Sequence, residues 1–115
     1  ITSDTIIASD GRSRWKRGGN KLVYSGKQFW WSQHQAGFEE LLDTRGANDV
    51  ASPLGEWTRV ECICRGDRLT IKINGVVVNE CYDVYPSAGK ILLQNEGNEV
   101  YFRNIRISAL DQAGR

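Results

Sequence analysis

Two polar residues stand at the end of an apolar stretch, where an expected strand gives way to a turn. Gln94 and Glu96 are two positions apart and follow the apolar residues 91–93. Because alternate side chains of an extended strand share a face, Gln94 and Glu96 can project together into one site. A carboxylate there can act as a general base, or it can bind a divalent metal that polarises a substrate carbonyl. We therefore predict Glu96 and Gln94 as the catalytic pair and assign no metal-ligand set.

A second group of candidates lies in the long connection over residues 26–52. Exposed Trp30 or Trp31 can stack on the apolar face of a ligand ring, whereas buried indoles would only seal a sheet edge. His34 is the single histidine of the chain, so it is the only candidate for an imidazole acid, base or ligand. No Gly-x-Ser-x-Gly pattern is present, which argues against a Ser-His-Asp hydrolase. A short helix is expected over residues 35–44.

Two cations complete the predicted substrate site. Arg103 follows the apolar residues 100–102, and Lys72 lies on the polar face of a predicted sheet. Their side chains donate hydrogen bonds of the kind that sugar oxygens accept, but ordinary surface ion pairs explain both residues equally well. Trp57 is expected to anchor the core.

The elements that must position these residues are antiparallel strands. Two tight turns, at residues 65–68 and 74–75, divide residues 60–81 into three segments of alternating apolar and polar residues. Asn-Gly at 74–75 tolerates the positive φ angles of a type I′ hairpin. A meander is therefore predicted. The expected rows across it are Val60, Ile73 and Val76; Cys62, Ile71 and Val78; and Cys64, Leu69 and Glu80.

The rest of the chain carries weaker signals. A second hairpin is expected from residues 91–95 and 100–102 around Gly97, with a β-bulge near Asn104, where the apolar phase changes. Short strands are expected at residues 5–8 and 23–24. The basic segment over residues 12–21 surrounds Trp15 and resembles a nucleic-acid patch, but acidic residues follow it closely, and a solvated surface loop is the preferred interpretation.

The three cysteines give no sign of an oxidised scaffold. In the expected register Cys62 and Cys64 point to one face and Cys81 to the other, which disfavours a disulfide within the meander. Cys-x-Cys also lacks a second ligand pair at a zinc-site spacing. Small, apolar packing roles are expected.

The strand motifs together resemble the 3-keto-disaccharide hydrolase domain family. Members typically begin the region with Gly-Glu-Trp and continue with a Gly-Asp/Asn-Arg turn, an Asn-Gly hairpin, a Leu-Gln motif ending in Gly, and Phe-Arg-Asn-Ile-Arg. The corresponding residues here are Gly55-Glu56-Trp57, Gly66-Asp67-Arg68, Asn74-Gly75-Val76, residues 93–97 and residues 102–106. The resemblance covers residues 53–110 well and residues 1–52 loosely.

This resemblance implies an all-β concanavalin A-like jelly roll, in which two antiparallel sheets form a sandwich, and an extracytoplasmic, exported bacterial protein. It also implies cleavage of 3-keto-glycosides. Many members carry Asp-His where Asn95-Glu96 stands here, so a noncatalytic, lectin-like module remains the alternative. Either role predicts an oligosaccharide or glycoside as ligand.

Composition is that of a folded globular domain. The chain is 40% hydrophobic and 25% charged, with a net charge of +1, and it has no apolar run long enough to span a membrane. Neither a nucleic acid nor a membrane is therefore an expected partner. We predict one sandwich domain over residues 1–112 with a tail at 113–115, incomplete at its N-terminus. A homodimer or a neighbouring domain can cover its open sheet.

Overall fold

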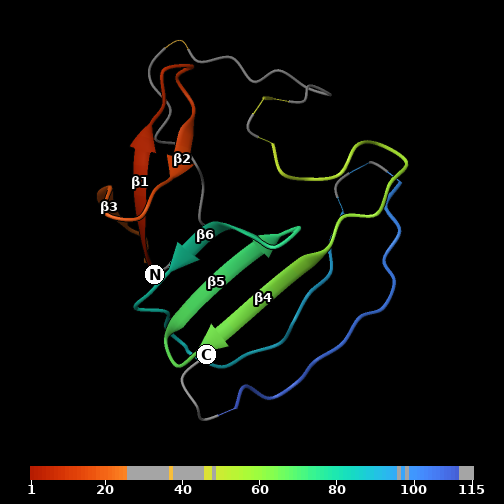
Figure 1. Ribbon diagram of the computed structural model, residues 1–115. Helices are drawn as coiled ribbons and strands as arrows, with labels where there is room; N and C mark the ends of the chain where they lie inside the picture. Colours follow the sequence, from red (N-terminus) through yellow and green to blue (C-terminus); the bar gives the residue numbers. More distant parts are fainter. Residues whose placement is uncertain (26–36, 38–45, 48, 96, 98, 112–115) are drawn as a thin grey trace.

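The chain forms two antiparallel three-stranded sheets, and the described residues contain no helix. The computed structural model describes residues 1–25, 37, 46–47, 49–95, 97 and 99–111. The first sheet has the order β2-β1-β3 and the second has the order β4-β5-β6 (Figure 1). Their strands are β1 (Thr2–Ile7), β2 (Ser13–Trp15), β3 (Asn20–Val23), β4 (Val60–Arg65), β5 (Arg68–Ile73) and β6 (Val76–Cys81). The all-β, antiparallel class is as predicted, whereas the expected helix at 35–44 lies outside the described residues.

The first sheet is built around β1, which pairs antiparallel with β2 on one side and β3 on the other. The strands expected at residues 5–8 and 23–24 correspond to β1 and β3. The expectation of a loop over residues 12–21 is wrong, because this basic segment contains β2 and the start of β3. Its Arg14, Lys16 and Lys21 side chains still face solvent, since a strand at a sheet edge exposes them as readily as a loop does.

Gly19 fixes the tight approach of the β2–β3 connection to β1. A Cβ atom at this position would lie 2.6 Å from the Thr5 carbonyl oxygen and 2.9 Å from that of Lys16. Both neighbours are backbone atoms, so neither can rotate away. We expect Gly19→Ala to lower the free energy of unfolding by about 1–3 kcal/mol, as overpacking does. Urea titration would measure the loss, with Gly18→Ala as the control. Gly18 has free space around it but a φ of +79°, so it tests backbone strain without a clash.

The meander of the second sheet forms as predicted through its two turns. Asn74 and Gly75 have φ angles of 48° and 83°, the two positive values that a type I′ hairpin needs. Gly66 has a φ of 58° in the turn between β4 and β5, where Arg65 pairs with Arg68. The predicted partners of β4 on β5 are confirmed throughout.

The register of β6 differs from the prediction beyond its first two pairs. Val76 lies opposite Ile73 and Val77 opposite Lys72, but Ile71 then faces Asn79 because the ladder shifts by one residue. This β-bulge leaves Val78 as the extra residue and turns the following side chains to the opposite faces. Leu69 consequently lies opposite Cys81 and not Glu80.

The bulge corrects the expected orientation of the cysteines. Leu69 pairs with both Cys64 and Cys81, so Cys62, Cys64 and Cys81 all lie on one face of the second sheet. All three are free thiols, and the Sγ atoms of Cys62 and Cys64 are 3.9 Å apart. Partial burial raises the pKa of the Cys62 and Cys81 thiols, which keeps both protonated at neutral pH.

Polar contacts between β1 and the end of β6 join the two sheets. Thr2 and Tyr82 exchange two backbone hydrogen bonds of 2.8 and 2.9 Å, and Ser3 Oγ donates to the Glu80 carbonyl oxygen at 2.9 Å. In Figure 1, β6 is accordingly the strand of the second sheet next to β1. Thr2, Ser3 and Thr5 are the buried polar residues of the described part, and none of its large hydrophobic residues is fully buried.

The predicted second hairpin does not form. The described residues between 84 and 111 run along the second sheet without pairing into strands, and Leu93 and Phe102 are each 49% exposed (Figure 1). Without a ladder there is no β-bulge, but Asn104 has a φ of 55°, so the backbone changes direction where the apolar phase shifts. An alternating apolar and polar pattern alone does not make a strand, because a strand also needs a neighbouring strand for its backbone hydrogen bonds.

Candidate functional site

The predicted site residues fall into two groups. Glu96, Trp30, Trp31 and His34 lie outside the described residues, so their roles stay predictions. Gln94, Arg103 and Lys72 are described. Gln94 is exposed and follows the apolar residues 91–93 in a part of the chain without strands.

Arg103 is held against an aromatic ring. Its guanidinium carbon lies 4.0 Å from the centroid of the Trp57 ring, which is the distance of a stacked cation–π contact. Trp57 is 50% exposed, so the expectation that it anchors the core is wrong. Instead the indole supports one face of the guanidinium. Stacking restricts the rotation of a long arginine side chain, and a stacked guanidinium can still donate hydrogen bonds from the edge of its own plane.

The loop that carries Trp57 is fixed by Asn74 of the β5–β6 turn. Asn74 Nδ2 donates to the Val50 carbonyl oxygen at 2.8 Å and to Ser52 Oγ at 3.1 Å, while its Oδ1 accepts from the Arg59 amide at 3.0 Å. Ser52 Oγ in turn donates to the Trp57 carbonyl oxygen at 2.8 Å. The Asn-Gly turn therefore also positions the loop that carries Trp57.

Lys72 lies on the polar face of the second sheet, as predicted, opposite Glu61 of β4 and Val77 of β6. An open hollow beside it is lined by Arg59, Glu61, Asn74 and Gly75. Arg59 and Glu61 form an exposed ion pair at 2.9 Å. The charges of a solvent-exposed ion pair contribute little to the binding of a ligand. Lys72 thus resembles a member of an ordinary charged sheet face more than a substrate ligand.

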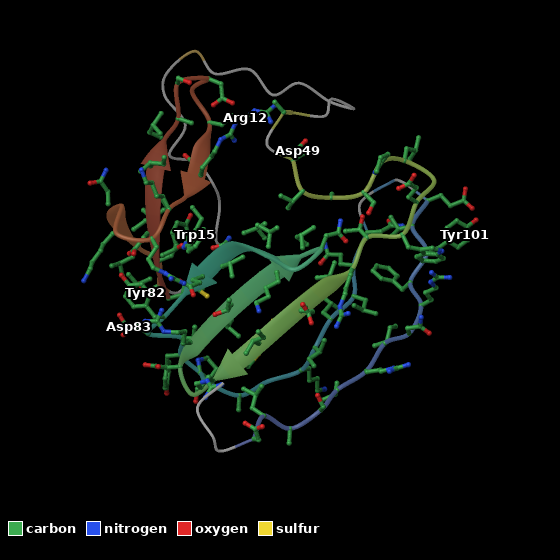
Figure 2. All side chains as sticks on the ribbon, viewed as in Figure 1. Arg12, Trp15, Asp49, Tyr82, Asp83 and Tyr101 are labelled. Atoms are coloured by element: carbon green, nitrogen blue, oxygen red, sulfur yellow. The ribbon has the colours of Figure 1, made fainter. Side chains whose placement is uncertain are left out.

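A cluster that sequence reasoning missed lies where the sheets meet. Tyr82 Oη donates to Asp4 Oδ1 at 2.7 Å, and the Gly18 amide donates to Asp4 Oδ2 at 2.9 Å. The cations of Arg68 and Lys21 lie 5.2 and 5.9 Å from the centroid of the Tyr82 ring (Figure 2). Asp4 and Tyr82 are 78 positions apart, and no local pattern links them.

The pKa shifts of this pair identify a structural contact. Hydrogen bonds from the Gly18 amide and the Tyr82 hydroxyl lower the pKa of Asp4, and the bond to Asp4 raises that of Tyr82. Both pKa values move away from neutrality, so neither group is tuned to exchange protons near pH 7. The pair instead links β1 to the residue that follows β6.

This link makes a pH-dependent contribution to stability. The folded pKa of Asp4 lies below its ordinary 3.8, so the contribution is present above that pH and is lost as the pH falls through the folded value. The folded pKa of Tyr82 lies above 10.0, so the contribution is also lost in strong alkali. We expect Tyr82→Phe to lower the melting temperature at neutral pH, and expect this difference to shrink below pH 3.8. Melting curves of both proteins across pH would test it. An equal difference at every pH would contradict the role of the Asp4 charge.

Two features are absent from the described residues. Among them, no three or more His, Cys, Asp or Glu side chains gather closely enough to hold a metal ion. The same part of the chain contains no helix long and apolar enough to cross a membrane.

The two antiparallel sheets define the class of this protein as an all-β module. Its family follows from comparison with known proteins. The profile of the 3-keto-alpha-glucoside-1,2-lyase-like domain matches residues 7–108. The chain therefore belongs to that family, which is concanavalin A-like. Comparison with curated proteins and with solved structures gave no significant match.

Proposed function

We propose that this domain cleaves 3-keto-glycosides by elimination across sugar carbons 1 and 2. The observation that carries the proposal is the match of residues 7–108 to a lyase-like family whose name specifies that bond and a 3-keto-glucoside. Arg103, stacked on Trp57 within the matched region, adds a donor suited to an oxyanion.

The proposed reaction follows from the chemistry of the ketone. The carbonyl at carbon 3 acidifies the proton on carbon 2, and a base removes that proton to give an enolate. The enolate then forms the carbon 1–carbon 2 double bond as the glycosidic carbon–oxygen bond breaks, and an acid protonates the departing alkoxide. Water can add to the resulting unsaturated ketone, which makes the net reaction a hydrolysis.

The residues of the chain are assigned to these steps as follows. Glu96 supplies the base, and Gln94, two positions earlier in the sequence, orients the sugar. Arg103 donates hydrogen bonds to the carbon 3 oxygen as negative charge develops there, when a preorganised donor contributes most. Trp30, Trp31 and His34 are proposed substrate contacts, whereas Lys72 is not included because it lies on an ordinary charged sheet face.

The experiment that tests the function compares 3-keto-trehalose with trehalose, which lacks the ketone. Release of glucose from the keto sugar alone is expected. In heavy water, elimination followed by addition places deuterium on carbon 2 of the released keto sugar, whereas direct displacement at carbon 1 leaves carbon 2 unlabelled. Failure of the folded domain to release glucose would overturn the lyase proposal.

A lectin-like role is the second candidate. Six titratable groups of the described part have resolved pKa shifts, and each of these pKa values moves away from neutrality: Asp4, Arg17, Cys62, Cys81, Tyr82 and Tyr101. Sugar binding needs no tuned acid or base, because amides and aromatic rings suffice. Saturable binding of the keto sugar without turnover would favour this role.

A further inference from the structure

An open groove runs between the two sheets, between the edge strands β2 and β6. Its lining comes from Ser13, Arg14 and Trp15 on β2, from residues 76–79 on β6, and from Val50. Figure 2 shows Trp15 on the side of the first sheet that approaches the second. Neither edge strand has a second hydrogen-bonded neighbour strand in the described part of the chain.

The β6 bulge lies within this groove. Val77 and Val78, where the ladder gains its extra residue, both line the hollow, as does Asn79. A bulge interrupts the row of edge hydrogen-bonding groups and bends the strand. The β6 wall therefore presents valine side chains and one amide to the groove.

The opposite wall is held in place by a chain of contacts that crosses between the sheets. Arg17 Nε and one terminal nitrogen donate to the two carboxylate oxygens of Glu80, at 3.1 and 2.8 Å. The Glu80 side chain is only 11% exposed. The same guanidinium lies over the Trp15 ring, 6.0 Å from its centroid. A bidentate pair fixes both the position and the plane of the guanidinium, so Glu80 positions Trp15 relative to β6.

This arrangement exists because of the bulge. In a regular ladder Glu80 would lie opposite Leu69 on the cysteine face, away from Arg17. The one-residue shift instead places it on the face of Thr70, its observed partner, and Thr70 Oγ1 lies 3.5 Å from a Glu80 carboxylate oxygen.

The charges along the groove are compensated. Arg14 is paired with Asp10, and Arg17 is paired with Glu80. An anionic ligand such as a phosphate or a nucleic acid would have to compete with these carboxylates. A neutral ligand would meet an indole and valine side chains for its apolar surface, and the Arg14 and Asn79 side chains for its hydroxyl groups.

We propose that the groove between β2 and β6 binds a neutral sugar ring, stacked on Trp15. The choice of a sugar as occupant rests on the proposed function, because the family acts on glucosides. Gln94 and Arg103 do not line the groove, so the ring bound here is not assigned to the reacting keto sugar. Remote binding of this kind raises affinity without taking part in the chemistry.

Titration with trehalose separates this inference from catalysis, because trehalose lacks the ketone. We expect the backbone amides of residues 13–15 and 76–79 and the Trp15 indole N–H to shift in proton–nitrogen NMR spectra. Trp15→Leu retains apolar volume but loses the aromatic face, and we expect it to weaken binding about 10-fold, whereas Trp15→Phe retains most of the affinity. Tyr85→Leu, an aromatic substitution at a position that is 93% exposed and outside the groove, serves as the control.

Glu80→Gln tests the positioning chain. It removes the charge that orients Arg17 and leaves Trp15 itself intact, so binding should weaken by roughly 3-fold through loss of preorganisation.

Each result decides one of the two proposals. Shifts at the groove without cleavage of the keto sugar would support the groove and overturn the lyase proposal. Cleavage with trehalose shifts confined to other residues, or equal affinity of Trp15→Leu, would overturn the groove and leave the lyase proposal standing. The groove proposal would also be overturned if trehalose at about 50 mM shifted none of the groove amides. A dissociation constant above that concentration corresponds to a binding free energy too small for a specific sugar site.

Discussion

Replacement of Glu96 by Gln is expected to reduce the cleavage of 3-keto-trehalose by roughly 10²–10⁴-fold, the range by which a positioned general base accelerates proton transfer. The amide has nearly the same shape as the carboxylate but cannot accept the carbon 2 proton. The loss should appear in kcat, with KM changed little, because a base acts in the transition state and not in ground-state binding.

Two controls make this result specific. Adding Gln94→Glu to Glu96→Gln tests whether a carboxylate at position 94 can replace the base. If the base must stand at position 96, the double variant stays inactive. The pH profile of kcat/KM should lose its acidic limb in Glu96→Gln if Glu96 is the base. Full activity in Glu96→Gln would keep the enzyme and remove Glu96 from the mechanism.

The second large effect is expected at Arg103. Arg103→Ala should lower kcat by roughly 10²–10³-fold, the cost of removing one donor from a developing oxyanion. Arg103→Lys keeps the charge but loses the planar group that stacks on Trp57 at 4.0 Å, so we expect only partial recovery. Steady-state kinetics on 3-keto-trehalose would measure both variants.

A double-mutant cycle separates a positioned donor from a merely cationic surface. If Trp57 acts by holding Arg103, then Trp57→Ala should lower kcat, and adding it to Arg103→Ala should cost little more. Independent, additive losses would contradict the positioning role of Trp57. Unfolding curves of all three proteins show whether any loss of activity comes from loss of the folded state.

Part of this site was predictable from local sequence, because its residues lie in motifs with a fixed backbone geometry. Asn74 and Gly75 specify a turn with two positive φ angles, and that turn aligns β5 with β6 at their first pair. The same Asn74 side chain also holds the Trp57 loop. No alternation pattern could have indicated this second role, since it depends on contacts with residues more than twenty positions away.

The contact between Arg103 and Trp57 is a similar case. Both residues were singled out from the sequence, one as a substrate ligand and one as a core anchor. They are 46 positions apart in the sequence. In the structure the Trp57 indole is half exposed and stacks against Arg103, whereas the sequence predicted a buried indole. Residue type gave the chemistry available to each, but only the folded chain gave the distance.

By itself the sequence determined the antiparallel strands of β4 to β6, their turns and the family to which the chain belongs, because these depend on short-range alternation and on turn residues. The tertiary structure decided the register of β6. One extra residue in that strand reverses every side chain after it, and the choice depends on which register lets Glu80 meet Arg17 and Ser3, respectively 63 and 77 positions away. The local sequence pattern does not indicate such distant partners. The Arg17–Glu80 ion pair between the sheets, the common face of the three cysteines and the groove at Trp15 could therefore be recognised only in the tertiary structure.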